Sequence, residues 1–146
     1  MSWLVLRHRG GIMWGVAALA LLTSSCGTDD VRLPVFPAQG KALYQGQPMV
    51  HALVVLHPLN EAEMPGVRPS GRVAADGSFV LSTYTENDGA PAGEYLVTIE
   101  WYPPRPEDEE ADVGPDRLEG RYSNPKTSGL RCTIKEGTNE IPPFEL

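Results

Sequence analysis

Cysteine is scarce in this sequence of 146 residues, which has only Cys26 and Cys132. Small domains that are held together by several disulfides are thereby excluded. If Cys26 is modified, as argued below, Cys132 has no partner left and the folded domain contains no disulfide. Histidine is almost as scarce, with three residues.

A hydrophobic run long enough to cross a membrane is also absent. The apolar run GGIMWGVAALALL at residues 10–22 has 13 residues, whereas a membrane-spanning helix needs about 20. Residues 1–9 contain Arg7 and Arg9 and no acidic residue. A basic leader before a short apolar run is typical of an export signal, so we predict that residues 1–25 are a signal peptide and not part of the fold.

Three small residues, Thr23, Ser24 and Ser25, separate this run from Cys26. The stretch resembles the lipobox of bacterial lipoproteins, although Thr23 stands where that family prefers Leu. The resemblance implies that the Cys26 thiol receives a diacylglyceryl group, that the bond before it is cut, and that the new amino terminus is acylated, for example by palmitate. The alternative is an ordinary secretory signal, because Thr23 and Ser25 also fit a small-x-small cleavage pattern.

Lipidation would decide where the protein resides. Two or three acyl chains anchor a protein stably, because each buried methylene adds about 0.8 kcal/mol. Gly27 follows the cysteine, whereas an Asp there is the known signal for retention at the inner membrane. We therefore expect a lipid-anchored protein of the cell envelope, at the outer membrane or the periplasmic face of the inner membrane.

Acidic residues outnumber basic ones. The signal peptide contains two of the 12 basic residues and none of the 19 acidic ones, so the mature chain has 10 against 19, a formal charge of −9. Such a surface repels phosphate backbones. Nucleic acid is therefore excluded as a partner.

The mature chain begins with a predicted tether, residues 26–38, which contains Asp29, Asp30, Pro34 and Pro37. The folded domain is predicted at residues 39–146, where apolar and polar residues alternate in short runs. Clear examples are VHALVVLH, GEYLVTIEW, LRCTIK and the hairpin SGRVAADGSFVLSTY around Asp76–Gly77. About seven strands and no helix predict an antiparallel β-sandwich.

The alternation also predicts which residues are buried. Val54 and Leu56 should face the core from one strand, and Tyr95, Val97 and Ile99 from another. Cys132 lies on the apolar face of LRCTIK, which favours a buried structural thiol over a reactive nucleophile. The final strand contains Pro142 and Pro143, which donate no hydrogen bonds, so it should lie at a sheet edge.

The segment GKALYQGQPMVHALVVL resembles the opening of carboxypeptidase regulatory-like domains, which have a transthyretin-like sandwich. The residues that match the pattern of that family are Gly40, Gly46, Pro48, Ala52 and Val54. SGRVAADGSFVL resembles the next hairpin of the family, APAGEYLVTI its following strand, and RYSNPKTSGLRCTIKEGTNEIPPFEL the endings of small lipoproteins with this domain. The resemblance covers about residues 39–146 and implies a non-catalytic domain, because its motifs specify turns and core faces.

No catalytic set, metal site or cofactor motif emerges from the residues. His51 and His57, if both lie on one strand, are about 20 Å apart and cannot share a metal ion. The acidic run at residues 107–112 lacks the spacing of a calcium loop, and no serine stands in a GxSxG motif. We therefore predict that the protein is not an enzyme.

One surface candidate remains in WYPPRP, where Trp101 and Tyr102 stand beside three prolines. These two aromatic rings on a stiff segment could contact a sugar or a partner protein. In the interpretation that we favour, Trp101 instead continues the core face of the preceding strand. Residues 102–129 are predicted to form a long loop that is either functional or mobile.

Together these observations predict a membrane-anchored envelope lipoprotein with a non-catalytic β-sandwich. Its predicted role is that of a binding or structural module, with an envelope protein or a polysaccharide as candidate partner. The alternative is a small envelope hydrolase whose site forms only in the tertiary structure.

Overall fold

The computed structural model shows an all-β chain over the residues that it describes, 32–104 and 114–146. Arg32–Leu146 forms one compact unit. The predicted signal peptide, Cys26, the tether up to residue 31 and the acidic run at residues 107–112 lie outside the described residues.

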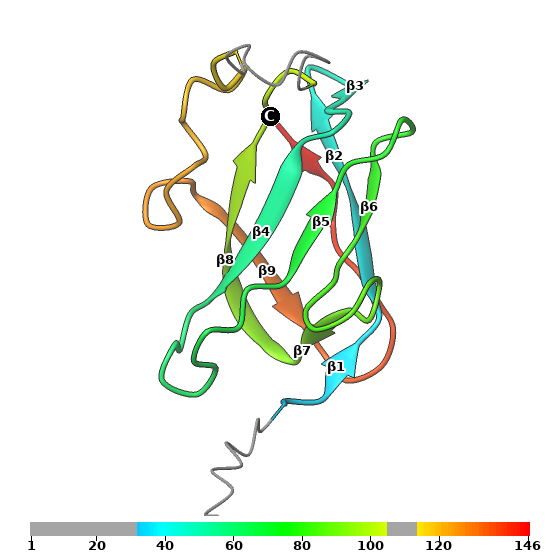
Figure 1. The fold of residues 1–146 in the computed structure, drawn as a ribbon, viewed down its shortest axis with the longest axis vertical. Helices are drawn as coiled ribbons and strands as arrows, with labels where there is room; N and C mark the ends of the chain where they lie inside the picture. Colours follow the sequence, from blue (N-terminus) through cyan, green and yellow to red (C-terminus); the bar gives the residue numbers. More distant parts are fainter. Residues whose placement is uncertain (1–31, 105–113) are drawn as a thin grey trace, which may run out of the picture. The chain divides into compact units, whose positions relative to one another are not determined.

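Eleven strands follow one another within the described residues, and Figure 1 labels β1 to β9. They are β1 (Val35–Phe36), β2 (Ala38–Tyr44), β3 (Gln47–Pro48), β4 (Leu53–Pro58), β5 (Ser70–Arg72), β6 (Ser78–Val80), β7 (Ala90–Pro91), β8 (Gly93–Glu100), β9 (Leu130–Ile134), β10 (Asn139–Glu140) and β11 (Phe144–Glu145).

One sheet contains four strands in the order β5-β4-β8-β9, all antiparallel. Its longest ladder joins β4 to β8, from Leu53 opposite Glu100 to Pro58 opposite Tyr95. Burial along β4 follows the two-residue period of a strand, since Val54 and Leu56 are fully buried and their neighbours are only half-buried. One face of this sheet therefore points to the core and the other points outward.

The second sheet is built around β2, which pairs with β3 and β6 in antiparallel orientation. On its other side β2 pairs with β10 and β11, and both of these pairings are parallel. The prediction of a purely antiparallel sandwich is therefore wrong at this edge. After β9 the chain crosses to the second sheet and runs beside β2 in the same direction.

The two prolines of the C-terminal segment explain why it forms two short strands. Pro142 and Pro143 lie between β10 and β11 and cannot donate hydrogen bonds to β2. Pairing to β2 therefore stops at Ile141, whose N–H donates to the Gln39 carbonyl at 2.7 Å, and resumes at Phe144. Among the described residues, β10 and β11 pair with β2 and with no other strand, so they lie at the edge of the sheet as predicted.

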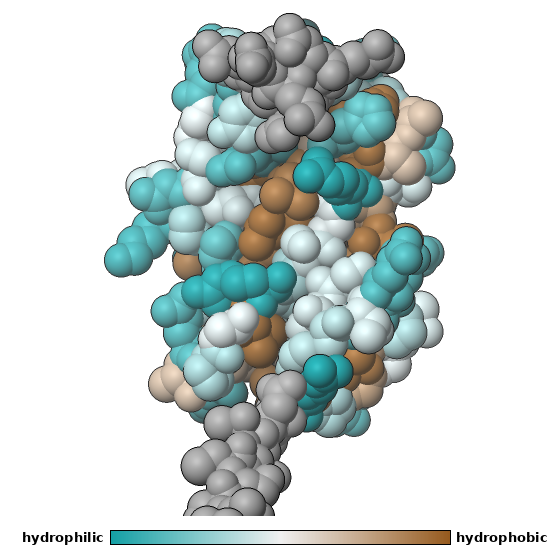
Figure 2. All heavy atoms as spheres, viewed as in Figure 1, coloured by the Kyte–Doolittle hydropathy of each residue, from teal (hydrophilic) through white to brown (hydrophobic). Residues whose placement is uncertain are grey.

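Both sheets contribute to one hydrophobic core. The predicted core residues Val54, Leu56, Tyr95, Val97 and Ile99 are all buried. The second sheet adds further buried side chains, including Ala38, Ala42, Phe79, Ile141 and Phe144. On the face seen in Figure 2, apolar side chains reach the surface only in separate patches among polar ones.

The turn at Asp76–Gly77 joins the two sheets. It is closed by a hydrogen bond from Gly77 N–H to the Ala74 carbonyl at 3.0 Å, and of its residues Gly77 alone has a positive φ, at 84°. β5 pairs mainly with β4, and β6 pairs with β2. The predicted hairpin therefore keeps its turn, but its arms are joined only by the Ser70–Ser82 bridge and by a hydrogen bond from Ala74 N–H to the Ser78 carbonyl at 2.7 Å among the described residues. A methyl group on Gly71 would lie 2.5 Å from the Val80 carbonyl oxygen, which is why this crossing requires glycine.

The strand count exceeds the predicted seven because several elements are short or divided. The Gln45–Gly46 turn separates β2 from β3, and the prolines divide the last strand. β1 pairs with β7 and lies within the stretch predicted as tether, residues 26–38. The folded unit thus begins at Arg32, several residues before the predicted start at residue 39.

Truncating Leu56 tests the core of the four-stranded sheet. Leu56 is fully buried, so Leu56→Ala removes apolar contacts and leaves a cavity, and should lower the free energy of unfolding by about 3 kcal/mol. Leu59→Ala is the matched control, because Leu59 is 49% exposed and should cost less than about 0.5 kcal/mol. Urea unfolding measures both values, and equal losses would contradict the assignment of the buried face.

Candidate functional site

Three side chains form a row across the outer face of the four-stranded sheet. Leu53 on β4 is paired with Arg72 on β5 and with Glu100 on β8. Because its neighbours Ala52 and Val54 are buried in the core, Leu53 points away from it. Adjacent strands are about 4.8 Å apart, so the Cα atoms of Arg72 and Glu100 are separated by about 10 Å.

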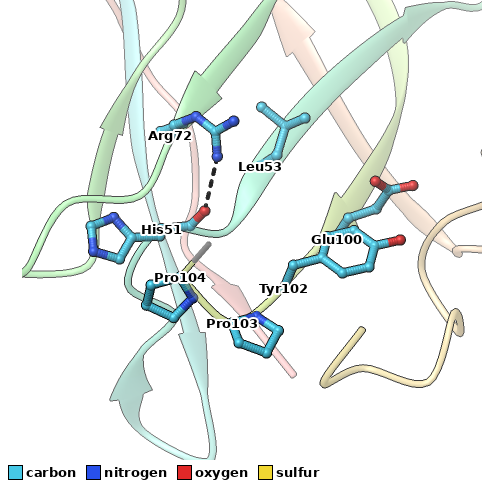
Figure 3. Close-up of a pocket in the computed structure, with 7 residues that line it drawn as sticks. All are labelled: His51, Leu53, Arg72, Glu100, Tyr102, Pro103 and Pro104. Atoms are coloured by element: carbon cyan, nitrogen blue, oxygen red, sulfur yellow. Dashed lines mark hydrogen bonds between the residues drawn. The ribbon is translucent and has the colours of Figure 1, made fainter. Parts of the chain in front are cut away.

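This row forms the floor of an open hollow with a volume of about 500 Å³. Its remaining walls come from two segments at the same end of the sheet: His51, which precedes β4, and Tyr102, Pro103 and Pro104, which follow β8. Figure 3 shows Arg72 and Glu100 on the two sides of Leu53, with the prolines and Tyr102 below the row. The hollow therefore combines one positive charge, one negative charge, an imidazole and an apolar floor.

Within the described residues, the two charges of the hollow are not neutralised by ion pairs. The Arg72 Nη1 donates a hydrogen bond to the His51 carbonyl at 3.3 Å, and neither Arg72 nor Glu100 forms a salt bridge with another described residue. A guanidinium group has five N–H donors, so most donors of Arg72 stay available. Both charged groups can accept a ligand without first breaking a contact between them.

His51 has a strained backbone. It occupies the third position of a turn that is closed by a hydrogen bond from Ala52 N–H to the Met49 carbonyl at 2.9 Å, and its φ is 70°. Residues other than glycine rarely adopt this left-handed backbone conformation, which costs about 1 kcal/mol or more. The sequence pattern allows His51 to lie on one strand with His57. It lies in the turn before β4 instead, where the strain holds its carbonyl toward Arg72.

Trp101 and Tyr102, the predicted surface pair, point in different directions. Trp101 is half-buried against the core, and its Nε1–H donates to the Val50 carbonyl at 2.9 Å. Its ring lies 5.9 Å from that of Tyr44. Tyr102 is 44% exposed and lines the hollow. Of the two, only Tyr102 can contact a ligand there, which agrees with the interpretation that Trp101 belongs to the core.

The segment after residue 113 fixes the end of β8 and so the wall of the hollow. The Asp116 carboxylate accepts hydrogen bonds from the N–H groups of Trp101 at 2.9 Å, Leu118 at 3.1 Å and Gly120 at 2.9 Å. Arg117 N–H donates to the Trp101 carbonyl at 2.8 Å, and its guanidinium lies 4.9 Å from the centre of the Trp101 ring. This part of the predicted long loop is therefore tied to the sheet.

His57 forms the hydroxyl–imidazole pair that a hydrolase would require, but in an unsuitable place. Its Nε2 is 2.9 Å from the Thr98 Oγ1. Thr98 is only 5% exposed, so a substrate carbonyl cannot reach its hydroxyl. Burial, and to a smaller degree the charge of Arg68, lowers the pKa of His57 below its usual value. The pair satisfies two polar groups within the sheet.

Cys132 behaves as a core residue, as predicted. It lies on β9, is 9% exposed and is free of disulfide bonding. Burial raises the pKa of its thiol to about 12, so the reactive thiolate form is suppressed at neutral pH.

Two further classes of feature are missing from the part of the chain that the structure describes. Three or more His, Cys, Asp or Glu side chains do not come together there in a way that could hold a metal ion. The same residues include no helix of the length and hydrophobicity that a membrane crossing requires.

Comparison with known proteins adds little to this picture. No protein-family model matches the chain, and no match is found among curated proteins. Among solved structures, the chain is similar to a DUF3823 family protein from Bacteroides ovatus ATCC 8483, with 20% sequence identity and a TM-score of 0.39. The match covers 73% of this chain and 44% of that chain, so this chain spans less than half the length of that structure.

The sequence identified only one residue of the hollow, Tyr102, as a candidate. Arg72, Leu53 and Glu100 were recognisable as outward-facing positions on predicted strands, but their meeting depends on the register of three strands. The sequence around His51 contains a turn signal. His51 lies between the letters MV and ALVVL, directly before the clearly predicted strand. A turn residue is needed at that position.

Comparing two replacements of His51 tests whether its backbone is strained. His51→Gly and His51→Ala both remove the imidazole, but only glycine adopts a φ of 70° without a penalty. The glycine variant should therefore be more stable than the alanine variant by about 1 kcal/mol. Thermal or urea unfolding gives the difference, and an alanine variant that is as stable as the glycine variant would show that the turn is not strained.

Proposed function

We propose that this chain is a lipid-anchored lipoprotein of the cell envelope that acts as a non-catalytic binding module. Its domain would be a carboxypeptidase regulatory-like, transthyretin-like β-sandwich. The anchor is supported by the sequence of residues 1–26, and the fold class by the all-β arrangement, whose two larger sheets share one core.

A lipid on Cys26 would keep the domain close to the bilayer. Only five residues lie between Cys26 and Arg32, where the folded unit begins, and the six residue-to-residue steps of an extended chain span at most about 20 Å. The proposed partners are therefore membrane-proximal components of the envelope, either a protein or a polysaccharide. The formal charge of −9 on the mature chain opposes binding to nucleic acid.

The observation that carries the binding role is the hollow over Leu53. It is lined by strand residues and a proline pair, and it presents two charges that form no salt bridge with another described residue. A cavity of this kind, with a few polar groups around an apolar floor, is typical of ligand sites.

Binding is better supported than hydrolysis. The thiol of Cys132 is buried and has a raised pKa, and the Thr98 hydroxyl is buried against His57. The hollow itself offers His51 as a base but no hydroxyl or thiol nucleophile within its lining other than the phenol of Tyr102. The proposed role therefore assigns recognition to these residues and no chemical step.

The anchor can be tested by intact mass. Protein extracted from membranes should have the mass of residues 26–146 plus acyl chains, and Cys26→Ser should keep its signal peptide and lose the lipid. An unmodified Cys26 in a protein that washes off vesicles would contradict the anchor.

The binding role can be tested by affinity capture from detergent-solubilised envelope, followed by mass spectrometry. Tyr102→Ala should lose a component that the wild-type chain retains, because the exposed ring is removed from the hollow. Leu59→Ala is the control, since Leu59 is similarly exposed and lies outside the lining of the hollow. Identical recovery with all three chains would show that binding does not use the hollow.

A further inference from the structure

We propose that the hollow binds a short zwitterionic peptide of two or three residues, with its carboxylate on Arg72 and its ammonium group on Glu100. This inference rests on the proposed binding function and specifies the chemical class of the ligand. It is carried by two opposite charges on either side of an apolar residue, neither of which forms a salt bridge with another residue that the structure describes.

The charge pattern selects an amphoteric ligand. An anion that binds Arg72 also comes near the Glu100 carboxylate, and a cation that binds Glu100 comes near the guanidinium. A neutral ligand would displace water from both charges without replacing the lost hydrogen bonds, which costs free energy. A ligand with one charge of each sign satisfies both ends at once.

The spacing selects a peptide rather than a free amino acid. The Cα atoms of Arg72 and Glu100 are two strand spacings apart, about 10 Å. An extended chain advances about 3.4 Å per residue, so the termini of a dipeptide or tripeptide match the separation that the two side chains can bridge. The Arg72 and Glu100 side chains lie on opposite sides of Leu53 (Figure 3), so a single amino acid would reach both charged groups only if the two side chains folded toward each other.

The floor and walls suit the middle of such a peptide. Leu53 is half-buried between the two charges, and the Tyr102 ring and the two prolines form an apolar wall (Figure 3). Apolar side chains of the peptide can be buried there.

Arg72 is held in position before the ligand arrives. Its Nη1 donates to the His51 carbonyl, and the turn that orients this carbonyl has an unfavourable φ of 70° at His51. Strain of this kind persists where the surrounding structure imposes it and is concentrated at functional sites. The remaining guanidinium donors can then form a two-point contact with a carboxylate.

Calorimetric titration of the full chain with the tripeptide Ala-Leu-Ala tests the inference. The free tripeptide should bind, and blocking either its carboxylate as an amide or its amine with acetyl should weaken binding about tenfold. Arg72→Gln should bind the acid and the amide equally, while Glu100→Gln should bind the free and the acetylated amine equally. This pattern assigns each terminus to one side chain.

Arg131→Gln and Glu94→Gln are the matched controls. Both residues are exposed on the same sheet, on β9 and β8, outside the lining of the hollow. They make the same charge changes and should leave the affinity and the preference for free termini unchanged. If they weaken binding as much as Arg72→Gln and Glu100→Gln do, the effect is one of net charge and the inference is wrong.

Two results would overturn the inference. Neither of them tests the proposed function, which depends on the anchor and capture experiments. The first is no heat of binding at millimolar tripeptide, and the second is equal affinity for free and blocked peptides. If Cys26 is acylated and Tyr102→Ala loses an envelope component, either result removes only the peptide assignment. If the anchor and the capture fail as well, the proposed function fails with it.

Discussion

The pairing of β4 with β8 is the constraint on which both the core and the hollow depend. Each residue of β4 has a fixed partner on β8, from Leu53 with Glu100 to Pro58 with Tyr95. Since side chains alternate between the faces of a strand, this register buries Val54 against Ile99 on one face and leaves Leu53 beside Glu100 on the other. A shift by one residue would exchange the two faces and destroy both features.

The segments next to this ladder form the hollow on the outer face of the sheet. β5 adds Arg72 to the row of Leu53 and Glu100, and the strained turn at His51 lies at its end. Asp116 holds the end of β8 through the N–H of Trp101, so that Tyr102 and the prolines leave the sheet in a defined direction. The hydrophobic core packs against the opposite face of the sheet, beneath the row of Arg72, Leu53 and Glu100.

The sequence was sufficient to predict the all-β class, the buried faces of β4 and β8, and the buried Cys132, because each follows from a two-residue alternation within one strand. It was not sufficient for the parallel pairing of β10 and β11 with β2, which depends on where the chain returns after β9. The hollow was missed for the same reason. Arg72, Leu53 and Glu100 are far apart in the chain, and only the register of three strands brings them into one row.

The most direct test of this account is a residue-by-residue NMR titration of the full, isotope-labelled chain with the free tripeptide Ala-Leu-Ala. The account predicts that the backbone amides of Arg72, Leu53, Glu100 and Tyr102 shift most and report one common dissociation constant. Shifts concentrated on β9 or near Val35–Phe36, or shifts that are absent from the row, would contradict it.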